Sequence, residues 1–151
     1  MENIPEITLA YAAGLIDGEG TITLSRRRKG YRFRSPVISM SSTTIELVEF
    51  MKSTFGGSIS SHKTYQLHHK KSYSWKIVDN TAVKLSELLL PFLREPEKRR
   101  RAELIAHDYK LATTKNGKYN PDKLAAKVFF EQTFFHPSTP SVETGGVPIS
   151  L

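Results

Sequence analysis

The stretch Ala13–Gly20 reads AGLIDGEG and decides the fold of this chain. An apolar, helix-forming run leads into it, and it ends in two glycines on either side of Glu19. The pattern predicts a helix over about 6–17 that stops near the first of these glycines, with an acidic side chain at its end. The rest of the chain is basic, and a carboxylate set into a basic protein indicates cleavage of a polyanion.

The charge balance favours a nucleic-acid partner. The 151 residues carry 22 Lys and Arg against 15 Asp and Glu, a net charge of +7. Nucleic acid is the commonest partner of such a surface, although a merely soluble basic protein has the same balance. Cysteine is absent, which excludes disulfides and thiolate metal sites. No apolar run approaches the ~20 residues that span a bilayer, and no targeting signal is seen. We therefore expect no membrane partner and an intracellular protein, in an organelle or in prokaryotic or archaeal cytoplasm.

Hydrophobic periodicity predicts an α+β fold. The first helix is followed by two strands, a helix, two more strands and further helices, an order typical of one antiparallel sheet backed by helices. The expected ranges are strands 21–25 and 31–34, a helix from about 43 to the glycine pair 56–57, strands 58–69 and 73–78, and helices 81–90, 97–114 and 121–135. Pro36 is expected to interrupt the second strand or to mark an edge or bulge. Residues 1–136 should form one domain and residues 137–151 an extended or disordered tail.

Small residues recur along the first helix. Ala10, Gly14 and Gly18 are four positions apart, with Ala13 beside them. Such spacing lets another backbone approach closely, so Ala10, Ala13 and Gly14 are expected at an interface between two copies of the chain. Packing of this face against the chain's own sheet is the alternative. Asp17, at the end of the helix, should accept N–H groups of the turn or of a partner helix, which is a structural role.

Glu19 is the candidate chemical acid. A carboxylate is a hard oxygen ligand of the kind that Mg²⁺ prefers, and Mg²⁺ keeps several waters and takes substrate phosphates as further ligands. Two chains that meet along the small-residue helix would bring two copies of Glu19 beside two phosphates, one on each strand of a duplex. The backbone carbonyl of Gly18 is a second candidate ligand. An exposed turn glutamate is the alternative.

Polar and basic side chains occupy one face of the predicted strands. Arg, Lys, Gln, Ser and Thr are the residues that bind phosphates and base edges, and a twisted two-stranded ribbon fits the major groove. A solvated polar face is the alternative. Six of the nine residues 26–34 are basic and form the predicted hairpin tip. The candidate DNA-binding residues are Thr21, Thr23, Ser25, Arg26, Arg27, Arg28, Lys29, Arg32, Arg34, Gln66, His68, Lys70, Lys71, Ser74 and Lys76.

The run Lys98–Arg101 begins a predicted helix. Cations at a helix N-terminus oppose the helix dipole, so we expect phosphate binding here rather than a role in stability. A solvated basic patch is the alternative. Lys98 near a scissile phosphate would stabilise developing charge or polarise an attacking water.

The segment Ala12–Gly20 closely resembles the LAGLIDADG motif of homing endonucleases. It departs from that motif at Ala12, Gly18 and Glu19, which stand for Leu, Ala and Asp. The order of elements through Leu111 also resembles the family core. The segment Pro91–Leu93, followed by Lys98–Ala102, resembles the part of that core that carries a basic-pocket lysine. Ser41 or Ser42 is the nearest candidate for the other polar pocket residue of the family.

A single copy of this motif is typical of family members that act as homodimers. The resemblance implies an αββαββα core, whose antiparallel sheets form a DNA-binding saddle, with added C-terminal helices. It implies an intron-encoded endonuclease that cuts double-stranded DNA at a long pseudo-palindromic target and leaves 3′ overhangs. Mg²⁺ is the implied cofactor, with Mn²⁺ or Ca²⁺ able to replace it in binding. Glu19 and Gly18 are then the metal ligands, and Glu19 and Lys98 the catalytic residues.

Two other functions fit the same scaffold. An RNA maturase would bind intron RNA and assist splicing, and a DNA-binding regulator would bind without cleavage. The acid at Glu19 argues against a purely binding role, but maturase activity beside cleavage stays open. A splicing assay of wild type and Glu19→Gln separates these alternatives.

Overall fold

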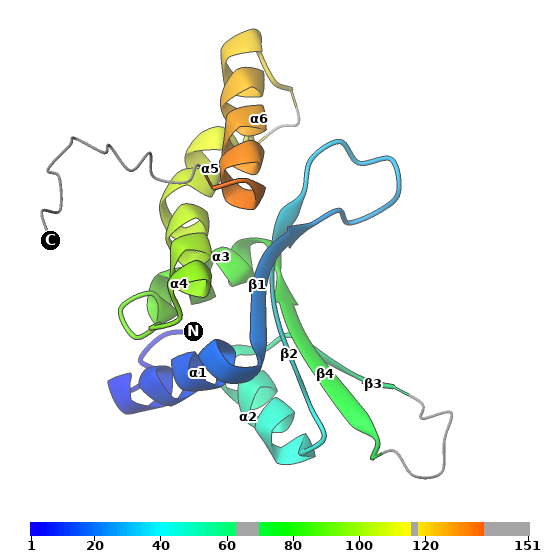
Figure 1. The fold of residues 1–151 in the computed structure, drawn as a ribbon, viewed down its shortest axis with the longest axis vertical. Helices are drawn as coiled ribbons and strands as arrows, with labels where there is room; N and C mark the ends of the chain where they lie inside the picture. Colours follow the sequence, from blue (N-terminus) through cyan, green and yellow to red (C-terminus); the bar gives the residue numbers. More distant parts are fainter. Residues whose placement is uncertain (63–69, 116–117, 138–151) are drawn as a thin grey trace, which may run out of the picture. The chain divides into compact units, whose positions relative to one another are not determined.

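A computed structural model describes residues 1–62, 70–115 and 118–137 and divides the chain into two compact units, 1–110 and 111–151. The predicted single domain over 1–136 stays a prediction. The elements that lie wholly in the first unit, in the colour order of Figure 1, are α1 (Glu6–Glu19), β1 (Gly20–Ser25), β2 (Ser35–Ser42), α2 (Ile45–Phe55), β3 (Ser58–His62), β4 (Ser72–Val78), α3 (Asp79–Leu89), α4 (Pro96–Glu103) and the π-helical η1 (Leu104–Asp108). No helix among the described residues is long and apolar enough to cross a membrane.

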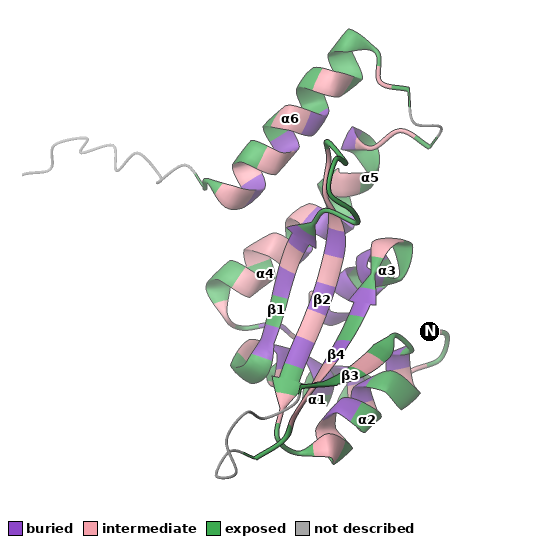
Figure 2. Cartoon of the chain, turned by 90° about the vertical axis from the view of Figure 1, so that its right-hand side faces the viewer, coloured by how far each residue is buried: buried purple, intermediate pink, exposed green. Residues whose placement is uncertain are grey.

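The four strands form one antiparallel sheet in the order β1-β2-β4-β3, which confirms the predicted α+β class. Helices α1, α2 and α3 pack on one face, and Figure 2 looks onto the other face, which no helix of the first unit covers. Side chains alternate between the two faces because successive residues of a strand point in opposite directions. The buried side of the sheet is made by Ile22, Leu24, Ile38, Met40, Trp75 and Ile77.

The second strand begins later than its sequence predicts. The expected strand over 31–34 is wrong, because these residues belong to the connection between β1 and β2, where the N–H of Tyr31 bonds the carbonyl of Arg28 at 3.2 Å. Pro36 lies inside β2, opposite Leu24, whereas β4 pairs with β2 only from Val37 onward. Pro36 therefore has a strand on one side only, and its missing N–H is tolerated near the start of the strand.

The glycine pair Gly56-Gly57 ends α2, as predicted, and starts the turn into β3. Both glycines have left-handed backbone conformations, with φ of +81° and +91°. The N–H of Gly56 bonds the carbonyl of Lys52 at 2.8 Å, and the indole N–H of Trp75 bonds the carbonyl of Gly56 at 2.8 Å. The pair thus joins α2 to the centre of the sheet.

The remaining boundaries agree in part. Helix α3 begins at Asp79, two residues before its expected start, and the predicted helix 97–114 is observed as α4, η1 and α5 (Tyr109–Ala112), which spans the boundary between the units. β3 ends at His62, and the rest of the expected strand up to residue 69 lies outside the described residues.

The second unit contains α6 (Pro121–Phe135), which has the predicted bounds. The Asn120 side chain caps it by accepting the N–H of Lys123 at 2.8 Å, and Pro121 occupies the first helical position. Lys127 is only 1% exposed; its ammonium donates to the Thr113 hydroxyl at 2.7 Å and lies 5.5 Å from the Phe130 ring centre. The predicted tail lies, beyond residue 137, outside the described residues.

Lys127 should make the stability of the second unit depend on pH. Burial lowers the pKa of its ammonium from the ordinary 10.5 to about 8, partly opposed by the charge of Glu131. Between these values the folded chain binds fewer protons than the unfolded chain, so the free energy of unfolding rises with pH, by up to roughly 3 kcal/mol. We expect Lys127→Met to be more stable than wild type at pH 7, and the difference to shrink from pH 8 to pH 10.5. Thermal unfolding followed by circular dichroism measures it, and a difference independent of pH would contradict the prediction.

Candidate active site and nucleic-acid interface

Glu19 lies where α1 passes directly into β1. The helix runs to Glu19, two residues beyond its expected end, and Gly20 is the first residue of the strand. The N–H of Gly20 bonds the carbonyl of Ile16, and a Cβ built on Gly20 would lie 2.7 Å from Cα of Ile16. Glycine is therefore required for this close approach of strand and helix, and the turn leaves the Glu19 carboxylate exposed.

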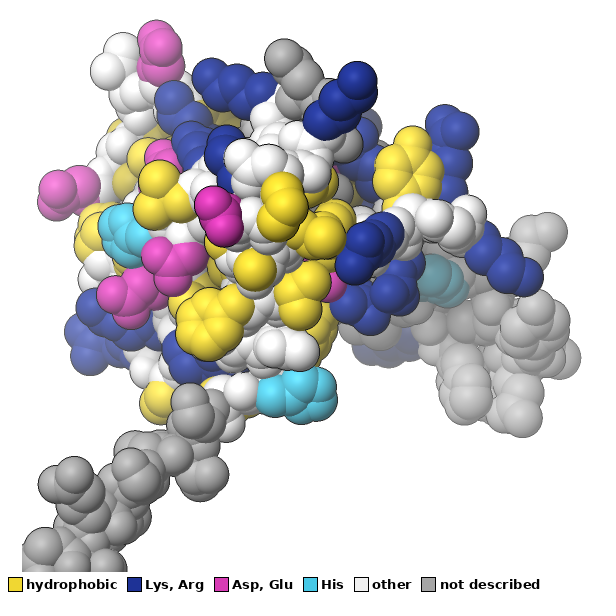
Figure 3. Space-filling view, turned by 90° about the horizontal axis from the view of Figure 1, so that it is seen from above, with side chains coloured by type: hydrophobic (Ala, Val, Ile, Leu, Met, Phe, Trp, Pro, Cys, Tyr) yellow, Lys and Arg dark blue, Asp and Glu magenta, His cyan; other side chains and the backbone are white. Residues whose placement is uncertain are grey.

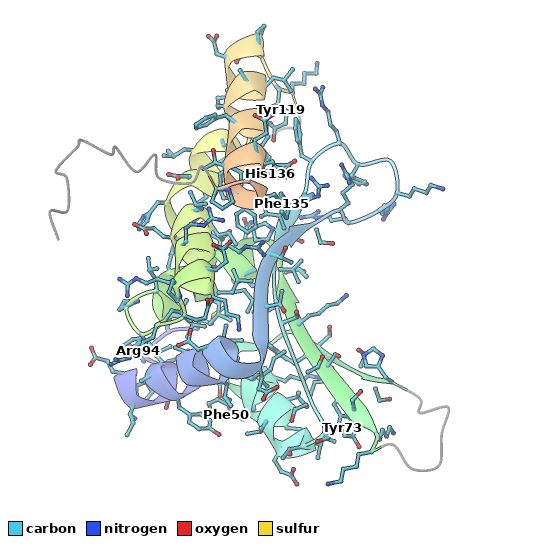
Figure 4. The ribbon with its side chains drawn as sticks, viewed as in Figure 1. Phe50, Tyr73, Arg94, Tyr119, Phe135 and His136 are labelled. Carbon is cyan, nitrogen blue, oxygen red and sulfur yellow. The ribbon has the colours of Figure 1, made fainter. Side chains whose placement is uncertain are left out.

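Asp17 accepts backbone N–H groups within its own chain, from residues 94 and 95 and not from the turn after α1. Its two carboxylate oxygens accept the backbone N–H groups of Arg94 at 3.0 Å and Glu95 at 3.1 Å. Arg94 is labelled in Figure 4, in the connection that runs past α1. These bonds join the end of α1 to the start of α4; a contact of Asp17 with a partner helix stays a prediction.

Lys98 reaches the same end of α1. The side chain of Glu95 caps α4 by accepting the N–H groups of Glu97 and Lys98, which sets the first turn of that helix. The Lys98 ammonium donates to the carbonyls of Ile16 at 3.0 Å and Asp17 at 2.7 Å. A cation there is favoured by the negative end of the helix dipole. Glu19 is thus the last residue of α1, and the Lys98 ammonium, which comes from α4, binds carbonyls at the same end of α1.

The cations of 98–101 have partners within the chain, which favours a structural role that the sequence did not suggest; phosphate binding by them stays a prediction. Arg99 donates to the carbonyl of Leu93 at 3.2 Å, Arg101 donates to the carbonyl of Ile22 at 3.0 Å, and both Arg100 and Arg101 pair with Glu97 at 2.8 and 3.0 Å. The hydrogen bond from Arg100 lowers the pKa of the Glu97 carboxyl against the opposing effect of its partial burial. Glu95 accepts the N–H groups at the helix N-terminus, and Glu97 accepts from Arg100 and Arg101, so the cations after them are compensated.

Sequence reasoning missed Glu95, the residue that orients Lys98. The signal was present, because Pro96 directly after it is typical of the first position of a helix and marks Glu95 as the capping position.

One face of α1 carries exposed small and apolar residues. Ala10, Gly14 and Gly18 are exposed, and so are Ile7 at 81% and Tyr11 at 51%. Tyr11 packs edge-on against Phe50 of α2, with ring centres 5.1 Å apart; Phe50 is labelled in Figure 4. The prediction that Ala13 lies at an interface between two copies is wrong. Ala13 is fully buried within its own chain, as the alternative of packing inside the chain requires.

The open face of the sheet is rich in hydroxyl groups. The strand register aligns Thr21, Ser39, Lys76 and Ser58 in one row across all four strands. In the neighbouring rows the hydroxyl of Ser74 lies 2.6 Å from that of Ser41 and 2.9 Å from Nε2 of His62. No acidic residue of the described strands lies on this face, and the positions expected to point outward are placed there: Thr21, Thr23, Ser25, Ser74 and Lys76.

Residues 26–34, here called the basic loop, connect β1 to β2 at one end of the sheet. Figure 3 shows Lys and Arg side chains (dark blue) gathered on the side where this loop lies. Arg26 donates to the carbonyl of Tyr31 at 3.0 Å, Arg32 lies over the Phe33 ring at 5.2 Å, and Arg27 pairs with Asp79 at 2.8 Å. The other predicted DNA-binding cations Arg28, Lys29, Lys70 and Lys71 are exposed, and Arg34 is partly buried. Gln66 and His68 lie outside the described residues.

The end of α1 carries oxygen donors of the kind that a divalent metal binds. Among the described residues no group of three or more His, Cys, Asp and Glu could hold a metal ion. The donors present are the Glu19 carboxylate and the last helix carbonyls, which are hard oxygens of the kind that Mg²⁺ prefers. The bonds of Lys98 stop at Asp17, one residue short of Gly18. One chain by itself thus supplies a few hard oxygen donors at this helix end and, within the described residues, no acidic cluster that would enclose a cation.

No protein-family model and no curated protein matches this sequence. Solved structures match its fold. The homing endonuclease I-CvuI, in complex with its target in the presence of Ca, matches with a TM-score of 0.64 and 19% identity over 86% of this chain and 81% of that chain. The LAGLIDADG homing endonuclease I-GzeII, in complex with its DNA target, matches with a TM-score of 0.61 and 16% identity over 87% and 45% of the two chains. The group I intron-encoded homing endonuclease I-CeuI, complexed with DNA, matches with a TM-score of 0.58 and 14% identity over 89% and 69%. The chain therefore has the fold of the LAGLIDADG homing endonucleases.

Proposed function

We propose that this protein is a homing endonuclease that cuts double-stranded DNA at a specific, long pseudo-palindromic site. The observation that carries the proposal is the exposed Glu19 at the junction of α1 and β1, with the Lys98 ammonium bound to the same helix end. The matched structures of this fold are homing endonucleases in complex with DNA, which supports the same conclusion.

The proposed active form is a homodimer. The exposed stripe of Ala10, Gly14 and Gly18 on α1 offers little side-chain bulk, so two such helices can approach closely. Ile7 and Tyr11 beside it add exposed apolar surface of the kind that interfaces bury. This chain also corresponds to 45% of the I-GzeII chain, as expected if two copies of it do the work of one longer chain.

In this dimer two Glu19 carboxylates, with the Gly18 carbonyls, would hold Mg²⁺ at the ends of the two α1 helices. The metal would supply a bound water of lowered pKa and neutralise charge on the phosphate. Lys98 keeps a fixed positive charge near the scissile phosphate, where it stabilises the charge that develops in the transition state. The hydroxyl-rich open face of the sheet reads bases, and exposed cations at its ends, such as Arg28 and Lys29, bind phosphates. One cut on each strand would leave 3′ overhangs.

The test of this proposal is cleavage of DNA by the purified full chain. DNA that flanks the host intron of the gene, joined without the intron, is the first substrate; a library of random duplexes is the second. We expect cleavage in Mg²⁺, none in EDTA, 3′ overhangs by end sequencing, and twice the chain mass by light scattering. A monomer that cuts neither substrate in Mg²⁺ or Mn²⁺ would overturn the proposal.

A further inference from the structure

The guanidinium of Arg27 is held by a carboxylate from a distant part of the chain. Its Nε donates to Oδ1 of Asp79 at 3.0 Å, and its Nη2 lies 2.8 Å from Oδ2. The two residues are 52 positions apart, one in the basic loop and the other at the start of α3. Two parallel bonds to two oxygens are the geometry with which arginine also binds phosphate.

Asp79 is the first residue of α3, where the helix dipole favours an acid, but its carboxylate does not cap that helix. Its φ is +58°, a left-handed conformation that few residues other than glycine, asparagine and aspartate adopt. The structure describes the whole of α3, and no side chain makes a capping hydrogen bond at its start. The hydrogen bonds of the Asp79 carboxylate connect it to Arg27 instead.

Stability does not explain the pair either. The side chain of Arg27 is 57% exposed and that of Asp79 is 32% exposed. Exposed ion pairs contribute only about 0–1 kcal/mol to folding, because water and salt screen them. What the pair does change is the number of cations that the basic loop can offer to an outside anion.

We propose that Asp79 is a specificity-determining residue, which acts by withholding Arg27 from the phosphates of random-sequence DNA. The inference rests on the proposed function, because it requires that the basic loop meets duplex DNA. Transfer of Arg27 from Asp79 to a phosphate exchanges one bidentate pair for another, and it leaves an unpaired carboxylate close to the DNA. Arg27 thus adds no phosphate contact to random DNA. Specificity is the ratio of the affinity for the target to the affinity for random DNA, so weaker binding of random DNA raises this ratio.

The experiment measures binding of a random-sequence duplex, without Mg²⁺, over a range of salt concentrations. Each phosphate contact adds about 0.9 to the slope of log K against log salt. Asp79→Asn keeps the size and the tolerance of a left-handed φ but removes the charge. It should steepen the slope by about 0.9 and tighten binding roughly fivefold to tenfold at 0.1 M salt.

Three further variants isolate the cause. Arg27→Gln alone should leave the slope of wild type unchanged, and the double variant Arg27→Gln/Asp79→Asn should return to it. Glu87→Gln removes the same charge from the same helix α3, where Glu87 pairs with Lys110 at 3.4 Å, and it should leave the slope unchanged. Circular dichroism checks that all variants are folded.

Two results would overturn the inference while DNA binding remains normal. One is a slope that falls by about 0.9 in Arg27→Gln, because Arg27 would then already contact a phosphate. The other is a folded Asp79→Asn whose slope is no steeper than that of Glu87→Gln. A wild-type chain that binds no duplex at all would instead contradict the proposed function itself.

Discussion

Glu19→Gln should abolish DNA cleavage and change DNA affinity by no more than a few fold. The amide keeps the size and the exposed position of the side chain at the α1–β1 junction but loses the charge that a divalent metal requires. Loss of the metal's contribution, several kcal/mol of transition-state stabilisation, corresponds to about 10³-fold or more in rate. Single-turnover cleavage in Mg²⁺ measures the rate, and a mobility shift in Ca²⁺ measures binding.

Two variants serve as controls for this loss. Glu46→Gln makes the same chemical change at another exposed acid, in the first turn of α2, and should cut at the wild-type rate. Glu19→Asp keeps a carboxylate that is one methylene shorter and restores the usual acid of the motif, so cleavage should remain measurable. Cleavage by Glu19→Gln at the rate of Glu46→Gln would exclude Glu19 as the metal-binding acid.

Gly57→Ala should destabilise the fold by more than about 3 kcal/mol. Its φ of +91° costs an alanine about 1–3 kcal/mol, and its new Cβ would overlap the backbone carbonyl of Lys76 and lie 2.9 Å from the indole nitrogen of Trp75. Lys76 and Trp75 lie in β4, a central strand, so neither neighbour can move without disturbing the sheet. Urea unfolding followed by Trp75 fluorescence measures the loss.

The adjacent glycine provides a matched control. Gly56 also has a left-handed φ, +81°, but no atom lies within 4 Å of a Cβ built on it. Gly56→Ala should therefore cost only the backbone term, about 1–3 kcal/mol. Equal losses in the two variants would mean that conformational strain, and not overlap with β4, sets the requirement for glycine.

Local patterns predicted the elements well where the pattern has one physical cause. The period of two in β1 and β4 arises because one face, with Ile22, Leu24, Trp75 and Ile77, is buried, and the predicted strands 21–25 and 73–78 are observed within one residue. The same alternation in residues 31–34 misled, because a loop can alternate by chance. The start of β2 depends on the pairing of Ser35 with Ser25 and then of Val37 with Val78, which a local pattern does not contain.

The sequence could suggest candidate residues of the site only where a local motif contains them. The motif made Glu19 a candidate, and the segment after Pro91 made Lys98 a candidate, but neither local pattern shows that the two segments meet. Lys98 bonds carbonyls of α1 that are 81 and 82 positions away. For Ala13, a small side chain suits both a close helix contact and a tight core, so its type alone did not decide between them. Whether such a residue is buried in the core or exposed at an interface depends on tertiary packing.

The row of Thr21, Ser39, Lys76 and Ser58 has a consequence for how the protein can change over time. These side chains point away from the apolar core, and substitutions at such surface positions usually alter stability by within ±0.5 kcal/mol. A new pattern of hydrogen-bond donors and acceptors can therefore be acquired one substitution at a time while the fold stays intact. If this face reads DNA as proposed, recognition of a different sequence is within reach of neutral drift, because the residues that keep the chain folded lie on the other side of the sheet.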